Sequence, residues 1–413
     1  MHVVYLTHQF FPRHVGGVEV YTLGLAKHAV STGHKVTVIT YHETQSLNPV
    51  DFGLQHTSYE GIPVVEIHYN LSIAPRPMKY EYNNLFTANA LRHLLLRLNP
   101  DLVHVMHAMK LSVSAMSVCD KLQIPFIVSL CDFWFICPRH TLLKWDDSLC
   151  DGPAHPLYCV KCLQELHGFV KRPNMVRDLF DLIKRNPFIK QSLLKAKRII
   201  ALSDFQKRMY ARNGIPAERM EVIQHGLDQP QVRFEARVLE RPYCIGFIGS
   251  LVEHKGAHIL LEALRLIPNS DVTCELYGSL DDTPYIARLR QLADEDNRIQ
   301  FMGTFDPSKM PDIIRRFDFL ALPSIWYENE PLVVKSALQA GVPVLSNNIG
   351  SLSDMIIHEK NGWLVSDRTV SSWAKALQDT IEKLPNFQMQ PVKVKSIEEN
   401  ANEMLTIYAE TIR

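Results

Sequence analysis

One segment, residues 319–345, constrains the fold of this chain more than any other. An apolar stretch at 319–322 is typical of a buried strand, and a polar loop with two glutamates follows it. Because proline is favoured at the first position of a helix, we expect a helix from Pro331 to Gly341, and the apolar residues 343–345 then predict a second strand. This order is that of parallel α/β sheets, in which ligands bind at the carboxyl ends of the strands.

The polar groups of this segment suit a phosphate next to a polyol. The start of the expected helix offers unpaired N–H groups and a partial positive charge, both of which favour a phosphate. Glu328 and Glu330 would repel a phosphate, but carboxylates accept hydrogen bonds strongly from hydroxyl groups. A phosphate and sugar hydroxyls side by side are the parts of a nucleotide sugar.

The same segment resembles the donor-binding signature of the family 4 glycosyltransferases, which are retaining enzymes of the GT-B fold. That signature has a glutamate, seven further residues and a second glutamate, followed by alanine and Gly-x-Pro-Val. Glu328 matches the first glutamate, which contacts the donor sugar in the family, whereas Ser336 stands where the second would hold the ribose. Other α/β proteins can carry such a loop and helix, so the resemblance depends on several motifs occurring in order. It implies donor-binding positions at Glu328, Asn329, Glu330, Pro331, Leu332 and Ser336.

A pair of glycines, Gly16 and Gly17, follows the first expected strand at residues 3–7 and begins a helix that reaches about Thr32. Adjacent glycines let a backbone approach a ligand closely, although a plain tight turn would also use them. With Glu19 they match the family's Gly-Gly-x-Glu. The resemblance implies a loop under the donor phosphates and near the acceptor.

A second phosphate motif follows the expected strand at residues 243–248. The family pattern is Gly-Arg-Leu…Lys-Gly, in which the two cations neutralise the donor diphosphate. Lys255 matches the lysine, and Ser250 occupies the arginine position. By the same resemblance, further donor contacts are implied at the ends of this strand and the next two, at Gly249, Ser250, Gly278, Met302 and Gly303.

Acceptor-side residues are expected in the first half of the chain. His107 follows the strand at 102–106, where a hydrogen-bonded structural histidine is the alternative interpretation. Cys131 and Asp132 follow the strand at 126–130 in a loop that resembles Leu-His-Asp-x-Trp-x-x-Cys-Pro-Arg of a family subset, with Cys131 in place of the histidine that contacts the transferred sugar. The resemblance implies catalytic roles for Glu328, Lys255, Asp132 and His107, and an acceptor side lined by Glu19, His107, Cys131 and Asp132.

Four cysteines lie in an insertion at about 131–170. Cys137, Cys150, Cys159 and Cys162 include one C-x-x-C pair, and four thiolates can close a tetrahedral structural zinc site in a loop with little core. An iron–sulfur cluster or four ordinary reduced cysteines are the alternatives.

Residues 171–198 carry nine basic side chains among apolar residues at helical spacing. A basic amphipathic helix can lie on an anionic membrane, whereas the alternative is a solvated face of helices whose other face packs in the core. Peripheral membrane contact is therefore expected if the acceptor is lipid-linked.

The length of 413 residues fits two α/β domains. Lys+Arg and Asp+Glu are equal at 44 each, which gives no reason to expect a nucleic-acid partner. The chain starts on an apolar strand without a charged leader, and it has no apolar run of membrane-spanning length. We therefore expect a cytoplasmic protein with reduced thiols, peripheral at the inner membrane face if its acceptor is held there.

Together these motifs predict two doubly wound, Rossmann-like α/β domains facing a cleft. The expected division is an acceptor-side domain at 1–228, a donor domain at 229–390, and a C-terminal helix at 391–413 that packs back toward the first domain. The resemblance implies retaining transfer of a sugar from a UDP- or GDP-sugar to a glycan or lipid-linked acceptor, in cell-surface polysaccharide biosynthesis and with no catalytic cofactor. The alternative is a non-catalytic GT-B protein that binds a glycan or a partner, because Ser336, Ser250 and Cys131 replace residues that the family uses.

Overall fold

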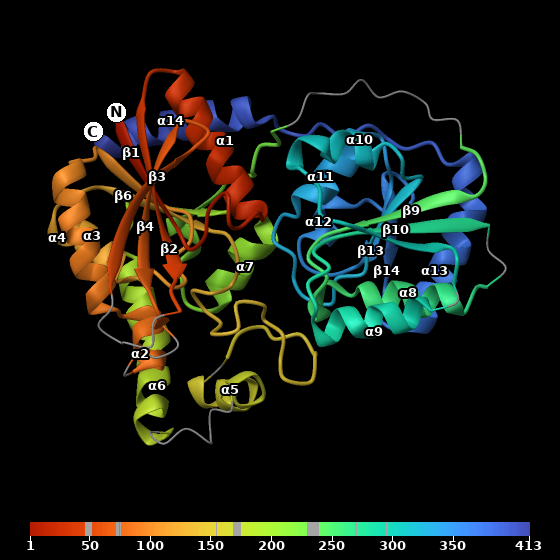
Figure 1. Cartoon of the computed structure of the whole chain (residues 1–413), viewed down its shortest axis with the longest axis horizontal. Coiled ribbons are helices and arrows are strands. Elements are labelled where there is room, and N and C mark those ends of the chain that lie inside the picture. Colours follow the sequence, from red (N-terminus) through yellow and green to blue (C-terminus); the bar gives the residue numbers. More distant parts are fainter. Residues whose placement is uncertain are drawn as a thin grey trace. The chain divides into compact units, whose positions relative to one another are not determined.

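The structure is a computed structural model. It describes residues 1–45, 52–71, 74, 76–153, 155–167, 175–228, 239–268, 271–294 and 296–413, with only the backbone described at 164–167 and 175. The chain divides into two compact units, each built around one sheet (Figure 1). The first unit consists of Met1–Gly226 and Ile397–Arg413, and the second of Leu227–Ser396. Residues 229–238, which begin the expected donor domain, lie outside the described residues.

The first unit contains an eight-stranded sheet. Its strands are β1 (His2–Thr7), β2 (Lys35–Glu43), β3 (Gly53–Tyr59), β4 (Ile62–Tyr69), β5 (Leu102–Val105), β6 (Phe126–Leu130), β7 (Arg198–Ala201) and β8 (Met220–Val222). The order is β3-β4-β2-β1-β5-β6-β7-β8, and every pair is parallel except β3 with β4. The carboxyl ends of the parallel strands therefore share one edge, where ligand-binding loops are expected.

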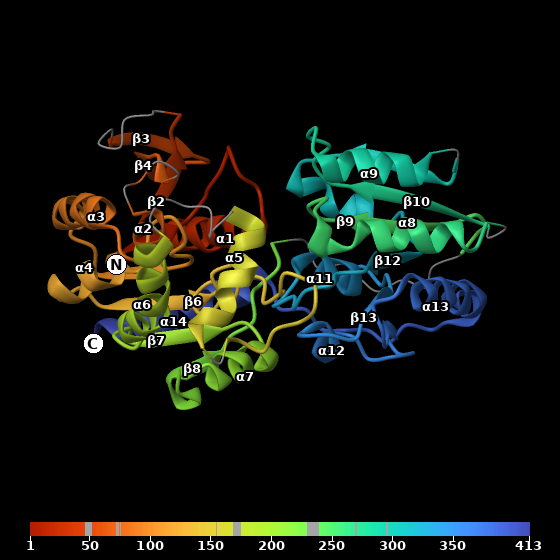
Figure 2. The ribbon, with the colours of Figure 1, turned by 90° about the horizontal axis from the view of Figure 1, so that it is seen from below.

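Helices pack around this sheet. They are α1 (Gly17–Ser31), α2 (Pro77–Tyr82), α3 (Leu85–Leu98), α4 (Ser114–Lys121), α5 (Cys159–His167), α6 (Met175–Leu193), α7 (Asp204–Arg212) and α14 (Ile397–Ile412), with 3-10 turns η2 (Pro156–Tyr158) and η4 (Ala217–Arg219). Helix α1 packs on α14, and α4 packs between α3 and α6. The side chains of Asn84 and Ser203 accept backbone N–H bonds at the starts of α3 and α7, as N-cap residues do. Figure 2 shows these elements from a second direction.

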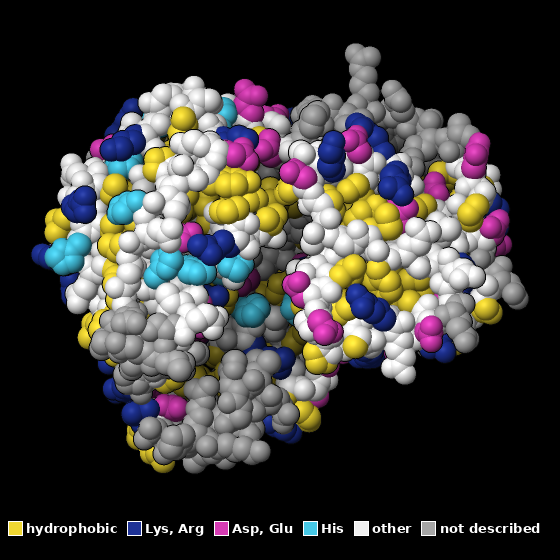
Figure 3. Space-filling view, in the orientation of Figure 1, with side chains coloured by type: hydrophobic (Ala, Val, Ile, Leu, Met, Phe, Trp, Pro, Cys, Tyr) yellow, Lys and Arg dark blue, Asp and Glu magenta, His cyan; other side chains and the backbone are white. Residues whose placement is uncertain are grey.

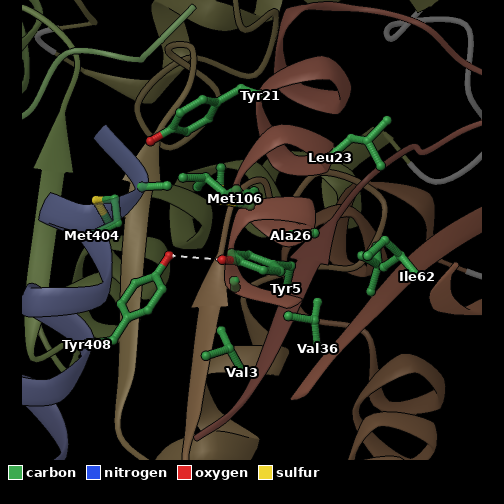
Figure 4. Close-up of a cluster of buried hydrophobic side chains, with 14 of the residues drawn as sticks. Val3, Tyr5, Tyr21, Leu23, Ala26, Val36, Ile62, Met106, Met404 and Tyr408 are labelled. Carbon is green, nitrogen blue, oxygen red and sulfur yellow. Dashed lines mark hydrogen bonds between the residues drawn. The ribbon is translucent and has the colours of Figure 1, made fainter. Parts of the chain in front are cut away.

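The last helix completes the core of the first unit. Side chains of β1, β2, α1 and α14 form one buried apolar cluster, part of which is drawn in Figure 4. Within it the Tyr408 hydroxyl lies 2.7 Å from Nδ1 of His104 and 3.4 Å from the hydroxyl of Tyr5. Burial lowers the pKa of His104 to about 3, so this ring is neutral and structural.

The second unit contains a six-stranded parallel sheet. Its strands are β9 (Tyr243–Ile248), β10 (Val272–Tyr277), β11 (Ile299–Gly303), β12 (Phe319–Leu322), β13 (Val344–Asn347) and β14 (Gly362–Val365), in the order β11-β10-β9-β12-β13-β14. The helices are α8 (Ala257–Arg265), α9 (Pro284–Ala293), α10 (Met310–Ile314), α11 (Leu332–Gln339), α12 (Leu352–Met355) and α13 (Val370–Lys383), with η5 (Glu253–Lys255), η6 (Pro307–Lys309) and η7 (Leu384–Asn386). Helices α10, α11 and α12 share an apolar cluster with the sheet, and α8 packs between α9 and α13.

Three details of the fold differ from the sequence-based expectation. Strand β3 and helix α2 were not predicted, because one is an exposed polar strand and the other is only six residues long. Helix α11 begins at Leu332, and Pro331 is its N-cap with an extended backbone. The described part of the chain contains no helix long and apolar enough to cross a bilayer.

Candidate active site

In the second unit, the loops that follow β9 and β12 are tied to each other. The N–H of Ile325 donates a hydrogen bond of 2.9 Å to the carbonyl of His254. Gly256 has a φ of 75°, and a Cβ at this position would lie 2.1 Å from the carbonyl oxygen of Pro323. Only glycine fits this close approach, which sets Lys255 beside the loop after β12.

Glu328 is the centre of this pair of loops. Its side chain is buried, and Oε1 accepts hydrogen bonds from Lys255 Nζ at 2.7 Å, Ser324 Oγ at 2.7 Å and Trp326 Nε1 at 2.8 Å. Burial alone would raise the pKa of Glu328, but Lys255 and the two neutral donors outweigh it and lower the pKa. The carboxylate is therefore ionised, and because three donors converge on Oε1, Oε2 keeps its lone pairs for another donor.

Side chains of later elements hold this loop in place. The backbone carbonyl of Glu328 accepts bonds from the N–H of Ser351 at 3.3 Å and from its hydroxyl at 2.7 Å. Asn347 donates to the carbonyl of Ser324 at 2.9 Å and accepts a bond of 2.8 Å from Nε1 of Trp373. The loop that carries Glu328 is thus braced from β13 and α13.

Two expected donor-binding side chains are used within the protein. Glu330 forms a buried ion pair with Lys335, and burial lowers the pKa of Lys335 although Glu330 acts in the opposite direction. The Ser336 hydroxyl donates to the carbonyl of Leu332 at 3.0 Å, inside α11. Asn329 is buried in the same loop. The side chains of Glu330 and Ser336 therefore have intramolecular partners, which the sequence did not reveal.

The other expected donor positions lie along one edge of the same sheet. The N–H of Gly249 donates to the carbonyl of Tyr277, and the N–H of Gly278 donates to the carbonyl of Gly303, each at 3.0 Å. These bonds join the ends of β9, β10 and β11 in a row of backbone groups. Ser250 and Met302 are exposed next to them.

In the first unit, Gly16 and Glu19 form the start of α1. Gly16 is the N-cap, Glu19 is the third helical residue, and a Cβ on Gly16 would lie 2.6 Å from Oε2 of Glu19. Burial raises the pKa of Glu19 to about 7, while the backbone amides of Glu19 and Gly16 and the nearby His107 act to lower it. A glutamate at this position that reaches back to the N-cap amide is one half of a capping box. Within the Gly-Gly-x-Glu motif, Glu19 thus reaches back to the amide of Gly16, and Gly17 is the first residue of the helix.

His107 and Asp132 lie together at the ends of β5 and β6. The N–H of Met109 donates to Nδ1 of His107 at 3.1 Å, and Nε2 lies 3.0 Å from Oδ2 of Asp132, at an angle outside that of a good hydrogen bond. Burial acts to raise the pKa of Asp132, but His107 and the N–H of Trp134, 2.7 Å from Oδ1, outweigh it and bring the pKa to about 2. The His107 side chain is 2% exposed and that of Asp132 is 16% exposed, so Asp132 is the member of the pair that a ligand can reach. The adjacent Cys131 is partly buried.

Arg185 holds the loop after Asp132, although the sequence had placed this residue in the basic stretch at 171–198. Arg185 on α6 is fully buried, donates to both carboxylate oxygens of Glu81 at 3.0 Å, and donates to the carbonyl of Trp134 at 2.7 Å. Nε1 of Trp134 also donates to Glu81 at 2.7 Å. Two further cations of this stretch, Lys195 and Arg198, pair with carboxylates, and residues 171–174 lie outside the described residues. These three basic side chains of the stretch therefore have acidic partners within the first unit.

Histidine side chains gather on one face of the first unit, as Figure 3 shows. Among the histidines of this unit, the rings of His42 and His68 lie 4.7 Å apart, and Nε2 of His68 lies 2.9 Å from Glu66. Burial and the neighbouring Arg13 and His68 lower the pKa of His42. This ring is therefore neutral at pH 7 and can exchange hydrogen bonds with hydroxyl groups.

No group of three or more His, Cys, Asp or Glu side chains in the described ranges is already arranged to hold a metal ion. None of the eight cysteines forms a disulfide, including the four for which zinc was expected. The zinc expectation therefore has no support from a preformed ligand set.

Known glycosyltransferases are similar to this chain in sequence and in fold. An uncharacterised glycosyltransferase of Methanocaldococcus jannaschii is 22% identical over 436 residues, which cover 96% of this chain and 98% of that protein. WcaL of Escherichia coli, a glycosyltransferase named for colanic acid biosynthesis, is 26% identical over 218 residues, about half of each chain (50% and 52%). Anabaena HepE, solved in complex with UDP-glucose, superposes with a TM-score of 0.63 at 19% identity over 100% of this chain and 98% of HepE.

The two parallel-sheet units are those of the GT-B fold, in which HepE is also built. The model described as "Glycosyltransferase Family 4" matches residues 15–229, and the model described as "Glycosyl transferases group 1" matches residues 228–400. The chain therefore belongs to glycosyltransferase family 4 and is a glycosyltransferase.

Proposed function

We propose that this enzyme transfers a sugar from a nucleotide-diphosphate sugar to a hydroxyl of a glycan or lipid-linked acceptor, with retention of the anomeric configuration. The second unit would bind the donor and the first unit the acceptor. A UDP-sugar is the favoured donor over a GDP-sugar, because the similarly folded HepE was solved with UDP-glucose. WcaL is named for colanic acid biosynthesis, which supports a role in making a cell-surface polysaccharide.

The observation that carries this proposal is the environment of Glu328. An ionised carboxylate with one oxygen saturated by Lys255, Ser324 and Trp326 presents its other oxygen in a fixed direction. Such an acceptor suits a donor-sugar hydroxyl, since hydrogen bonds to a charged acceptor are about twice as strong as neutral ones. Lys255 stays close enough to contribute its charge to the diphosphate.

The diphosphate would be held by Lys255, by the amide end of α11 and by the backbone at Gly249 and Gly278. Ser250 offers a hydroxyl where the family pattern has a cation. Stabilisation of the leaving group therefore depends on one lysine and on backbone donors, which makes Lys255 more important here than it would be beside an arginine.

The first unit supports a reaction without a dedicated protein base. With a pKa of about 2, Asp132 is too weak a base to take a proton from a hydroxyl, and Nδ1 of His107 already accepts the N–H of Met109. We assign Asp132 to orienting the acceptor hydroxyl and assign the proton to the departing diphosphate. Gly16, Gly17 and Glu19 would shape the loop beside the acceptor, with Cys131 at its edge. The transfer itself then needs no metal, and zinc in the cysteine-containing insertion would be structural.

Glu328→Gln tests the proposal. The variant keeps the shape of the side chain but loses the charge, and we expect kcat/KM for transfer or donor hydrolysis to fall by about 100-fold, the scale of losing one oriented electrostatic contact. UDP release from UDP-sugars measures the rate, and Glu382→Gln on the exposed surface of α13 is the matched control. Full activity in Glu328→Gln would contradict the proposed role of Glu328. Failure of UDP-, GDP- and ADP-sugars to bind in calorimetry would instead support the non-catalytic alternative.

An exposed apolar surface favours a membrane-bound acceptor as a second part of the proposal. Leu157 and Tyr158 on η2 and Val176 and Phe180 on α6 are exposed, and the two elements pack together. Lys184 is exposed one turn beyond Phe180. We infer that this surface meets an anionic bilayer when the acceptor is lipid-linked, and that the enzyme works at the cytoplasmic face. Co-sedimentation with vesicles that contain anionic lipid tests this inference. The wild type should sediment with the vesicles and a Tyr158→Asp/Phe180→Asp variant should not; equal sedimentation of both proteins would refute the inference.

A further inference from the structure

Charged and imidazole side chains form a row along one edge of the first sheet. The neighbouring strands at this edge are β4, β2, β1, β5 and β6, and each side chain of the row lies in the second half of a strand or in the loop after it. The row consists of Glu66 and His68 on β4, His42 on β2, His8, Arg13 and His14 after β1, His107 and Lys110 after β5, and Asp132 after β6. A lysine or arginine side chain lies beside the clustered histidines in Figure 3. Because the carboxyl ends of parallel strands share one edge, these groups belong to one region of the surface.

Direct contacts hold both ends of the row. On the β4 side, Nε of Arg13 lies 3.5 Å from Glu66, and Nε2 of His68 lies 2.9 Å from the same carboxylate. On the other side, the rings of His8 and His107 lie 4.2 Å apart. Glu66 is thus already matched by a cation of the row.

Lys110 connects the two sides. It follows β5 with a φ of 66°, in the left-handed region that residues other than glycine seldom adopt. Its Nζ lies 5.6 Å from the centre of the Tyr41 ring on β2, so the side chain reaches past the end of β1, which lies between β5 and β2. In the part of the chain that the structure describes, this ammonium forms no ion pair with a carboxylate, whereas Arg13 does so with Glu66.

His14 shows that the two cations lie near each other. This ring is exposed, and its pKa is lowered by burial and then by Lys110 and Arg13. Both charged neighbours that act on His14 are therefore cations. A negatively charged ligand group at this position would be stabilised by the same two side chains.

Buried polar groups in the middle of the row add a second observation. The His8 side chain is 9% exposed, and its Nδ1 has no hydrogen-bond partner among the described residues. The same is true of the buried hydroxyls of Thr7 and Thr40, which are paired in register at the ends of β1 and β2. Since buried polar groups are normally hydrogen-bonded, these groups point to a polar ligand beside them.

We propose that the acceptor carries a negatively charged group, either the carboxylate of an acidic sugar or a phosphate ester, and that Lys110 and Arg13 bind it. Arginine has five N–H donors, so Arg13 can contact Glu66 and still donate to this group, while Lys110 supplies an unmatched charge. Three strand spacings of about 4.8 Å separate β2 from β6, so the charged group lies well beyond the hydroxyl that Asp132 orients. The proposal rests on the assignment of the acceptor to the first unit and adds the chemical class of that acceptor.

Calorimetry on the full-length chain tests the proposal. UDP is added in excess so that the donor side is occupied, and the probes are methyl β-D-glucuronide, α-D-glucose 1-phosphate and the neutral methyl β-D-glucoside. At least one anionic probe should bind about tenfold more tightly than the glucoside, the effect of one charge-assisted hydrogen bond. Tighter binding of the glucuronide identifies an acidic sugar, and tighter binding of glucose 1-phosphate identifies a phosphate ester.

A pair of lysine variants places the binding in the first unit. In Lys110→Gln the preference for the anionic probe should fall to less than about threefold, because the unmatched charge is lost. Lys121→Gln, on the exposed surface of α4, is the matched control and should keep the wild-type preference.

Two results would overturn the proposal. One is a wild type that binds neither anionic probe more tightly than the glucoside, a comparison that does not depend on any variant folding well. The other is an undiminished preference for the anionic probe in Lys110→Gln. Neither readout uses transfer, so either failure leaves the proposed function standing, and full activity of Glu328→Gln would leave this proposal standing.

Discussion

Replacing Glu19 with glutamine should remove a large part of the pH dependence of the first unit's stability. Glu19 is 4% exposed, and its pKa is raised from 4.5 to about 7, chiefly by burial. Between these two values the folded chain holds a proton that the unfolded chain has lost. The stability that this proton contributes is complete below pH 4.5 and is lost as the pH rises to about 7.

The size of the effect follows from the two pKa values. At about 1.4 kcal/mol per unit, a rise from 4.5 to about 7 makes this one group lower the stability of the first unit by about 3 kcal/mol between low pH and pH 8. The glutamine side chain is neutral throughout, and its amide oxygen can still accept the N–H of Gly16. The free energy of unfolding of Glu19→Gln relative to the wild type should therefore rise by about 2–3 kcal/mol between pH 5 and pH 8.

Hydrogen exchange of peptides from β1 and α1 measures this quantity in the first unit alone, which matters because the two units need not unfold in one step. Comparing variant and wild type at each pH cancels the intrinsic pH dependence of exchange. Glu60→Gln is the control, since Glu60 is exposed in a pair with Lys27 and should change by less than about 0.5 kcal/mol. A difference between Glu19→Gln and the wild type that stays constant from pH 5 to pH 8 would refute the assignment of a raised pKa to Glu19.

Two further substitutions test contacts that hold the site loops. Gly256→Ala should lower the rate of transfer at least tenfold and should destabilise the protein more than Gly33→Ala does. Both glycines have a positive φ, but only a Cβ at 256 meets the Pro323 carbonyl. Equal losses of stability for the two variants in thermal denaturation would contradict this. Arg185→Met should destabilise the first unit by about 3 kcal/mol in chemical denaturation, because the variant leaves the Glu81 carboxylate without its cation. Lys184 is exposed, and Lys184→Met should change the free energy of unfolding by less than about 0.5 kcal/mol. An Arg185→Met variant as stable as Lys184→Met would show that the buried ion pair contributes little.

Much of the fold could be predicted from local patterns. The bounds of β6 and β9 match the predictions, because each strand is bordered by proline, glycine or polar residues. Strand β3 was missed because its side chains are polar and mostly exposed, so its extended form depends on pairing with β4. Helix α6 continues through Pro187, although an internal proline usually breaks or kinks a helix.

The site was predictable by residue type but not by pairing. Glu328 and Lys255 could be placed at the carboxyl ends of strands, but Ser324 and Trp326, which complete the environment of Glu328, carry no signal of their own in the sequence. The buried pair of Arg185 and Glu81 was missed because its members lie 104 positions apart. Contacts of this range follow from the packed fold and not from spacing along the chain.

The last helix, α14, belongs to the first unit although the whole second unit precedes it in the chain. Leu227 and Ser396, the two ends of the second unit, are joined by a parallel bridge, so that unit is one contiguous insertion. During translation the core of the first unit therefore stays incomplete, with the position of Tyr408 unfilled, until the entire second unit has left the ribosome. Newly made chains that stall before residue 397 would expose an apolar surface of the first sheet, where a chaperone could bind.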